Sequence, residues 1–237
     1  MSHFTVIVCI DDPEKLEAAL APFDENLEGV AEPKWDYWRI GGRWGGYFPF
    51  RPEYRDKVML PERGWDSPGE VPPGHCDGGP KLALDLDELR TAKAAGARKT
   101  YREYQALTEG TPEPVPWSVF ADNISEGNGY TVEQARDEYH AQPRWKVIAG
   151  TDFRYYDDAF ATFGKPESLF VEHARAQAVP GYATLTTDGR WRAPGTMDCF
   201  AISDEGEGDR IGYWEAANAY IDSLPGDVFL IAVDCHI

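Results

Sequence analysis

The stretch His3-Phe4-Thr5-Val6-Ile7-Val8-Cys9-Ile10 decides the fold, because its residues are almost all apolar or β-branched. An uninterrupted run of this kind is typical of a strand that is covered on both faces. The chain closes on a second such run, Val228 to Ile237. We expect these two terminal strands to be neighbours near the centre of one sheet, with helices packed on it.

The segments between the terminal strands alternate between helix and strand patterns. Caps and apolar spacing predict helices at about 13–21, 85–108, 131–140, 165–178 and 213–224. A hairpin is predicted over 182–192, with Asp188-Gly189 at its turn. These elements predict an α+β fold, with a mixed or antiparallel sheet of ferredoxin-like flavour. We interpret residues 1–237 as a single domain that carries a loop-rich and helical insertion at about 51–165.

An aromatic block at Lys34 to Phe48 contains three of the eight Trp residues, two Tyr, two Arg and four Gly. Strand-like runs flank Gly41-Gly42, which predicts a hairpin with these glycines at its turn. Backbone N–H groups and arginine forks suit a phosphate or carboxylate, while an indole face can stack on a ring. The alternative is that the tryptophans are core and the glycines only turn the chain. The residues predicted to bind a ligand are Trp35, Trp38, Arg39, Gly41, Gly42, Arg43 and Trp44.

The charge of the chain limits its partners. The formal net charge is −18, which repels phosphate backbones and anionic membranes over any wide face. We therefore expect no nonspecific nucleic-acid binding and no membrane association, although a locally positive pocket still suits one small anion. We also expect no transmembrane helix and no signal peptide. The cysteines at 9, 76, 199 and 235 are scattered, which favours reduced thiols and a cytoplasmic location.

Several separate parts of the chain resemble an uncharacterised phage-encoded family. Its members start Met-Ser-His-Phe-Thr-Val, carry a Lys-Trp-Asp-x-(Trp/Tyr)-x-Ile-Gly-Gly-Arg-Trp block and end Val-Asp-Cys-His-Ile. Here these are Met1 to Val6, Lys34 to Trp44 and Val233 to Ile237, and Tyr182 to Trp191 followed by Gly195-x-Met197 is also similar. The resemblance implies a phage gene product of unknown activity in the cytoplasm of a bacterial host. It assigns no catalytic residue and no cofactor.

His3 and His236 each lie on a predicted terminal strand, so pairing of the strands brings the two imidazoles together. With Asp234 or Asp36 they suit either a divalent metal or general acid–base catalysis. His3-Phe4-Thr5 also matches half of the His-x-Thr signature of two-histidine phosphoesterases, but only Ile237 follows His236. The alternative is that both histidines are solvated strand ends.

Asp36 stands between two aromatic residues, so it is either a catalytic base or the ion-pair partner of Arg39 or Arg43. The catalytic candidates are therefore His3, Asp36 and His236. We assign no metal site, and the cofactor stays open.

Two functions are compatible with this sequence. In the first, a phage-type protein binds a nucleotide-like or phosphorylated small ligand through the aromatic block. It then sequesters or cleaves a host signal nucleotide as counter-defence, and as an enzyme it would be a phosphodiester or nucleotide hydrolase using histidines. In the second, an acidic nucleic-acid mimic or interaction protein blocks a basic host protein. We expect the turn at 41–46 to open onto a pocket that His3 or His236 reaches. If it projects away from both strand ends, the aromatic block is structural and any chemistry lies elsewhere.

Overall fold

The computed structural model describes residues 3–62, 70–124, 129–156, 158–196 and 204–237. The chain forms two compact units, one of residues 1–92 and 175–237 and the other of residues 93–174. The predicted insertion at 51–165 overlaps the second unit, whereas its loop-rich part belongs to the first unit.

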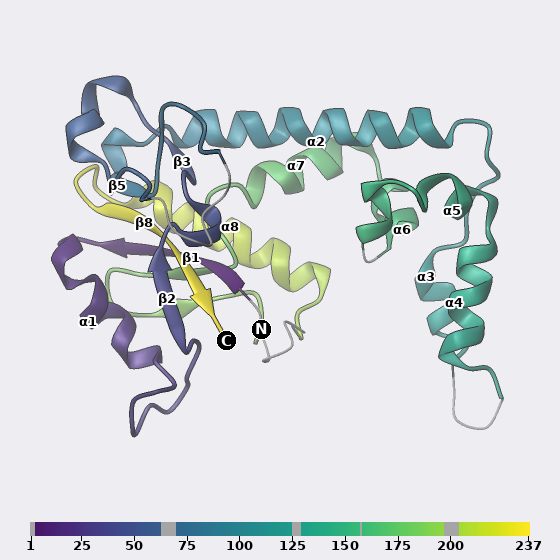
Figure 1. Cartoon of the computed structure of the whole chain (residues 1–237), viewed down its shortest axis with the longest axis horizontal. Helices are drawn as coiled ribbons and strands as arrows, with labels where there is room; N and C mark the ends of the chain where they lie inside the picture. Colours follow the sequence, from purple (N-terminus) through teal and green to yellow (C-terminus); the bar gives the residue numbers. More distant parts are fainter. Residues whose placement is uncertain (1–2, 63–69, 125–128, 157, 197–203) are drawn as a thin grey trace. The chain divides into compact units, whose positions relative to one another are not determined.

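The two terminal strands lie at the centre of the sheet of the first unit. β1 (His3–Ile10) and β8 (Phe229–His236) pair antiparallel over their whole length, from His3 opposite His236 to Ile10 opposite Phe229. Figure 1 shows these strands side by side, with the two chain ends close together. The sheet order is β2-β8-β1-β6-β7, which confirms that the terminal strands are central neighbours.

The remaining strands make the sheet mixed, as the predicted α+β class allows. β2 (Tyr37–Ile40) and β5 (Gly78–Pro80) pair antiparallel with different parts of β8. On the other side, β1 runs parallel to β6 (Ala183–Leu185), which pairs antiparallel with β7 (Trp191–Arg192). The predicted hairpin at 182–192 is therefore confirmed. The antiparallel last strand and the parallel neighbour of β1 are features of ferredoxin-like sheets.

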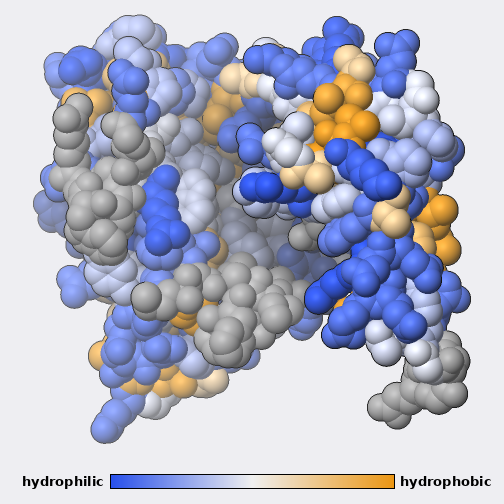
Figure 2. All heavy atoms as spheres, turned by 45° about the vertical axis from the view of Figure 1, so that its right-hand side comes forward, coloured by the Kyte–Doolittle hydropathy of each residue, from blue (hydrophilic) through white to orange (hydrophobic). Residues whose placement is uncertain are grey.

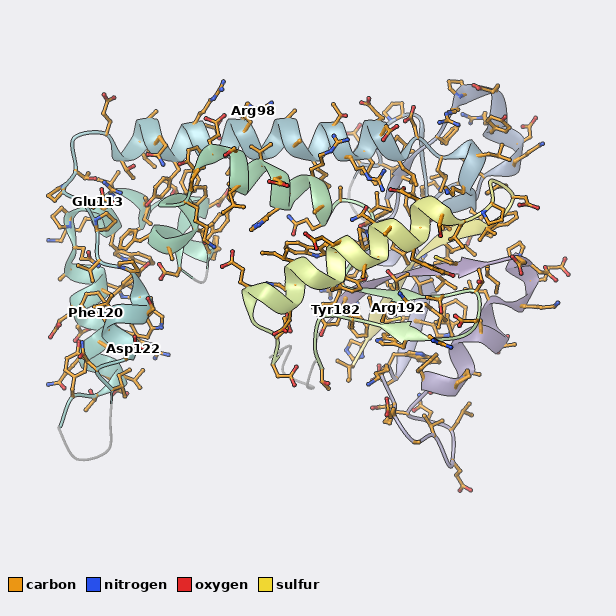
Figure 3. The ribbon with its side chains drawn as sticks, turned by 180° about the vertical axis from the view of Figure 1, so that it is seen from behind. Arg98, Glu113, Phe120, Asp122, Tyr182 and Arg192 are labelled. Carbon is orange, nitrogen blue, oxygen red and sulfur yellow. The ribbon has the colours of Figure 1, made fainter. Side chains whose placement is uncertain are left out.

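Alternation along the strands divides the core of the first unit into two apolar layers. Ile7 and Cys9 belong to the layer beneath α8, whereas Phe4, Val6 and Val8 belong to the layer beneath α1. Figure 3 shows α8 lying over the β6–β7 hairpin, where Tyr182 and Arg192 are labelled. The helices of this unit are α1 (Leu16–Leu20), the start of α2 (Leu86–Thr108) and α8 (Glu207–Ser223).

The predicted hairpin around Gly41-Gly42 is wrong. β3 (Phe48–Pro49) does not return along β2 but pairs with β4 (His75–Cys76) in a separate two-stranded sheet. The two glycines have φ values of +68° and +51°, and a short 3₁₀ turn over Gly42–Trp44 follows them. This turn packs against β8, and β8 is also the strand that pairs with β2. The aromatic block therefore contributes one strand to the main sheet and then leaves it.

The second unit is helical and has an aromatic core. Tyr104 and Phe163 stack at its centre, with ring centroids 4.2 Å apart. The predicted cap at Thr131 is present, because its hydroxyl accepts the Gln134 N–H while the Gln134 side chain accepts the Thr131 N–H. The helices after α2 are α3 (Trp117–Ala121), α4 (Val132–Ala141), α5 (Pro143–Ile148), α6 (Ala159–Phe163) and α7 (Glu167–Ala176), whose last residues belong to the first unit.

The visible surface in Figure 2 is mostly hydrophilic, as a chain with 27% charged residues leads us to expect. Within the part of the chain that the structure describes, no helix combines the length and apolar character needed to cross a membrane.

Cys9 and Cys76 are buried free thiols, and burial raises the pKa of each to about 12. Little thiolate is therefore present at neutral pH. We expect iodoacetamide to leave both residues unlabelled in the folded chain and to label both in urea, as read by peptide mapping. Equal labelling rates in the two conditions would contradict this burial. Cys235 is also a buried free thiol, and Cys199 lies outside the described residues.

Candidate functional site

Two histidine–carboxylate pairs lie together where β1 begins and β8 ends. His3 Nδ1 is 2.8 Å from Asp234 Oδ1, and His236 Nδ1 is 2.5 Å from Asp36 Oδ1. An ionised carboxylate can only accept, so each Nδ1 carries a proton that it donates. The two imidazole centroids are 4.9 Å apart, with their planes at 68°. We call these four residues the dyad cluster; it contains all three predicted catalytic residues.

The register of the sheet accounts for the dyad cluster. His236 lies directly opposite His3 on one side and Tyr37 on the other, and residues opposite each other in a sheet share a face. Asp234 is two residues earlier on β8 and therefore on that same face. It reaches diagonally to His3. Asp36 precedes β2 and is fixed by its backbone N–H, which donates to the His236 carbonyl at 2.9 Å.

The histidines are not solvated strand ends. The exposed fraction of the side chain is 9% for His3 and 14% for His236, while Asp234 retains only 2%. Asp36 is the most exposed member, at 32%. Partial burial reduces competition from water for the two hydrogen bonds, so each carboxylate fixes the tautomer and the ring orientation of its histidine.

The glycine turn packs directly on Asp234. The Arg43 backbone N–H donates to Asp234 Oδ2 at 2.9 Å, while Oδ1 of the same carboxylate binds His3. A Cβ atom built on Gly42 would lie only 2.4 Å from Asp234 Oδ2. Only a residue without a side chain permits this approach. Asp234 therefore connects the turn to one histidine.

A second carboxylate supports the other side of the turn. Asp77 Oδ1 accepts the Gly46 N–H at 2.6 Å, and a Cβ atom on Gly41 would lie 2.4 Å from its Oδ2. Burial raises the pKa of Asp77, while the Gly46 hydrogen bond and the charge of Arg39 oppose this rise. Sequence reasoning missed Asp77, because it lies in a glycine- and proline-rich segment without periodicity.

The raised pKa of Asp77 makes the stability of the fold depend on pH. The free energy that Asp77 contributes is fully present below its ordinary pKa of 3.8, and it is lost as pH rises through the folded value. Asp77→Asn keeps an acceptor oxygen but cannot ionise. We expect its free energy of unfolding, relative to the original chain, to increase between about pH 4 and about pH 7. Urea titrations of both proteins measure this difference, and a difference that shrinks over that range would contradict the prediction.

A cavity of about 580 Å³ lies beside β2. Neither histidine and no residue of the turn at 41–46 is among its described lining residues, so the expectation that this turn opens onto a pocket within reach of a histidine is not met by this cavity. The cavity and the dyad cluster are separate features of the same sheet edge. Arg39 connects them, because it lines the cavity and lies opposite Asp234 in the sheet register. The described lining residues are Trp38, Arg39, Ile40, Met59, Leu60, Glu62 and Asp77.

The structure divides the predicted ligand-binding residues into different environments. Trp35 is only 5% exposed and packs in the core beneath α1, so the alternative interpretation describes it correctly. Trp38 and Arg39 line the cavity, and Gly41 and Gly42 form the turn. Arg43 is exposed and Trp44 is partly buried on the 3₁₀ turn.

Tyr37 is a site residue that the sequence reasoning did not select. It is 48% exposed and lies opposite His236. A strand-end aromatic opposite a candidate catalytic residue is the signal that would have identified it. Its ring offers a stacking surface beside the dyad cluster.

Within the described ranges, no three His, Cys, Asp or Glu side chains are placed to hold a metal ion. Both Nδ1 atoms of the dyad cluster already bind carboxylates. The chemistry that this arrangement offers directly is proton transfer at the two Nε2 atoms.

Comparisons with protein-family models, curated proteins and solved structures found no match for this chain.

Proposed function

We propose that the first unit binds a nucleotide-like phosphodiester and cleaves it by general acid–base catalysis at the dyad cluster. The observation that carries this proposal is the pair of imidazoles, each oriented by its own carboxylate, with ring centroids 4.9 Å apart. Imidazole is the side chain best suited to exchange protons near neutral pH. Two oriented imidazoles provide one acid and one base within reach of a single phosphorus centre.

Water and the phosphodiester are the only reactants in the proposed reaction. One neutral imidazole takes a proton from water as the water oxygen forms a bond to phosphorus. The other imidazole, protonated, donates its Nε2 proton to the leaving oxygen as the second P–O bond breaks. Asp36 and Asp234 stabilise positive charge on His236 and His3 while it is present. The two histidines then exchange their proton states through solvent.

Groups around the dyad cluster suit the rest of such a ligand. Arg39 lies opposite Asp234 and is a fork of donors for phosphate oxygens. The exposed ring of Tyr37, or Trp38 in the adjacent cavity, offers a stacking surface for a base.

A panel of cyclic mononucleotides and dinucleotides tests the proposal. Turnover is followed by chromatography, and binding is measured separately by calorimetry. Cleavage that depends on His3 and His236 supports the hydrolase. Saturable binding without turnover supports sequestration instead. If the protein neither binds nor cleaves any member of the panel, the proposal is overturned for nucleotides.

The biological role of the protein is also part of the proposal. A phage origin and a counter-defence role rest on the sequence resemblance, and a role as an acidic mimic rests on the net charge alone. The cavity beside β2, with Trp38 in its wall, favours a small ligand over a mimic.

A further inference from the structure

A second cavity lies within the helical unit, and the proposed function makes no use of it. Its volume is about 300 Å³, at the lower end of the range for small-molecule sites. All its described lining residues belong to the unit of residues 93–174. These residues are Trp117, Arg136, Tyr139, His140, Trp145, Arg154 and Tyr156.

The aromatic walls of this cavity are held by the core. Tyr139 is 4% exposed, and its ring contacts Trp117 edge-on at 5.8 Å and Trp145 at 5.3 Å. His140 stacks on Trp145, with centroids 4.3 Å apart and planes at 23°. Because the rings pack on one another, little side-chain entropy remains to be lost on ligand binding.

The cavity also carries two arginines, and Arg136 acts electrostatically on the nearby Glu133. Arg136 and Arg154 are exposed, and neither forms an ion pair within 4.0 Å among the described residues. Arg154 lies over the Tyr155 ring and donates to the Ala149 carbonyl at 3.3 Å. Its Nη2 also donates to the Tyr155 hydroxyl, so these contacts orient the guanidinium without a carboxylate partner among the described residues.

Asp158 is an acidic group beside this cavity, and its oxygens are already engaged. It accepts the Trp117 N–H at 2.8 Å and the Tyr139 hydroxyl at 3.2 Å. It also accepts the Phe160 and Ala161 N–H groups as the cap of α6. Asp158 therefore holds the walls of the cavity together and has little capacity left to bind a cation there.

We propose that this cavity binds a planar aromatic anion, with its ring against the tryptophans and its phosphate or carboxylate on Arg136 and Arg154. The proposal is independent of the chemistry at the dyad cluster. Stacking and charge recognition act on different parts of such a ligand, so a molecule with both parts binds more tightly than either part alone.

Calorimetry on the full chain tests this site with AMP as the probe, and with adenosine and inorganic phosphate as its parts. We expect AMP to bind at least about tenfold more tightly than either part. Arg154→Gln and Arg136→Gln should each weaken binding about tenfold. The matched control is Arg98→Gln, which removes the same charge from an arginine on α2 that pairs with Glu167 at 3.4 Å (Figure 3).

A second set of variants distinguishes binding at the helical cavity from binding at the dyad cluster. Binding at the helical cavity should persist in His236→Ala and in Arg39→Gln, whereas a ligand of the dyad cluster should be lost from Arg39→Gln only. The proposal is overturned if AMP binds no better than adenosine, or if Arg154→Gln and Arg98→Gln behave alike. It is also overturned if Arg39→Gln alone removes the binding.

Discussion

His236→Ala is expected to lower the rate of phosphodiester cleavage by a hundredfold or more, because general acid or base catalysis contributes about 10² to 10⁴ in rate. The change removes one of two proton-transfer groups and leaves Asp36 without its partner at 2.5 Å. Arg39 and the cavity beside β2 stay in place, so the dissociation constant of the substrate should change little. His3→Ala should have a similar effect, since the reaction needs both an acid and a base.

The matched control for these variants is His75→Ala. His75 belongs to β4 of the same unit, and its Nδ1 lies 3.3 Å from the Pro73 carbonyl rather than beside a carboxylate. The His75→Ala protein should cleave the substrate at the rate of the original chain. Single-turnover kinetics with saturating substrate separate the chemical step from binding. A His236→Ala protein that retains full activity would remove the dyad cluster from the mechanism.

Gly42→Ala should destabilise the first unit by about 2 to 4 kcal/mol. The new Cβ atom would lie 2.4 Å from Asp234 Oδ2, and the φ value of +51° disfavours any residue with a side chain. To relieve the contact, Asp234 must move away from the Arg43 N–H and from His3. The variant should therefore lose activity even at temperatures where it stays folded.

Gly29→Ala separates the two causes of this effect. Gly29 also has a positive φ, +83°, but a Cβ atom there would meet nothing within 4 Å. It should cost only the backbone strain, about 1 to 2 kcal/mol. Urea unfolding of both variants measures the difference, which isolates the contact with Asp234. Equal losses of stability in the two proteins would show that Gly42 is needed for its backbone conformation alone.

The central part of the sheet was predictable from the sequence because its signal is strong and local. The continuous apolar runs at 3–10 and 228–236 predict buried strands, and burial on both faces favours a central place. The Asp188-Gly189 turn predicts its hairpin for a similar reason, since the turn chemistry lies within a few residues. Pairing of the terminal strands then places His3 opposite His236.

The strand pairing of the aromatic block could not be predicted from the sequence. Gly41-Gly42 has the composition of a hairpin turn, yet the partner of β2 is β8, almost two hundred positions further along the chain. Nothing near the glycines encodes that choice. Asp77 escaped prediction for the same reason, because its role depends on the distant Gly41 and Gly46. Trp35 and Trp38 look alike in sequence, and only the packing separates a core side chain from one that lines a cavity.

β8 lies between β1 and β2 in the sheet, so the dyad cluster forms only when β8 is in place. β1 and β2 have no direct pairing in the sheet order, so β8 is the element that brings their residues to one place. Before β8 inserts, His3 and Asp36 belong to separate strand edges, and no partial version of the dyad cluster exists. Closing so long a loop is slow compared with forming local contacts. Catalysis would therefore require β8 to be paired with both β1 and β2.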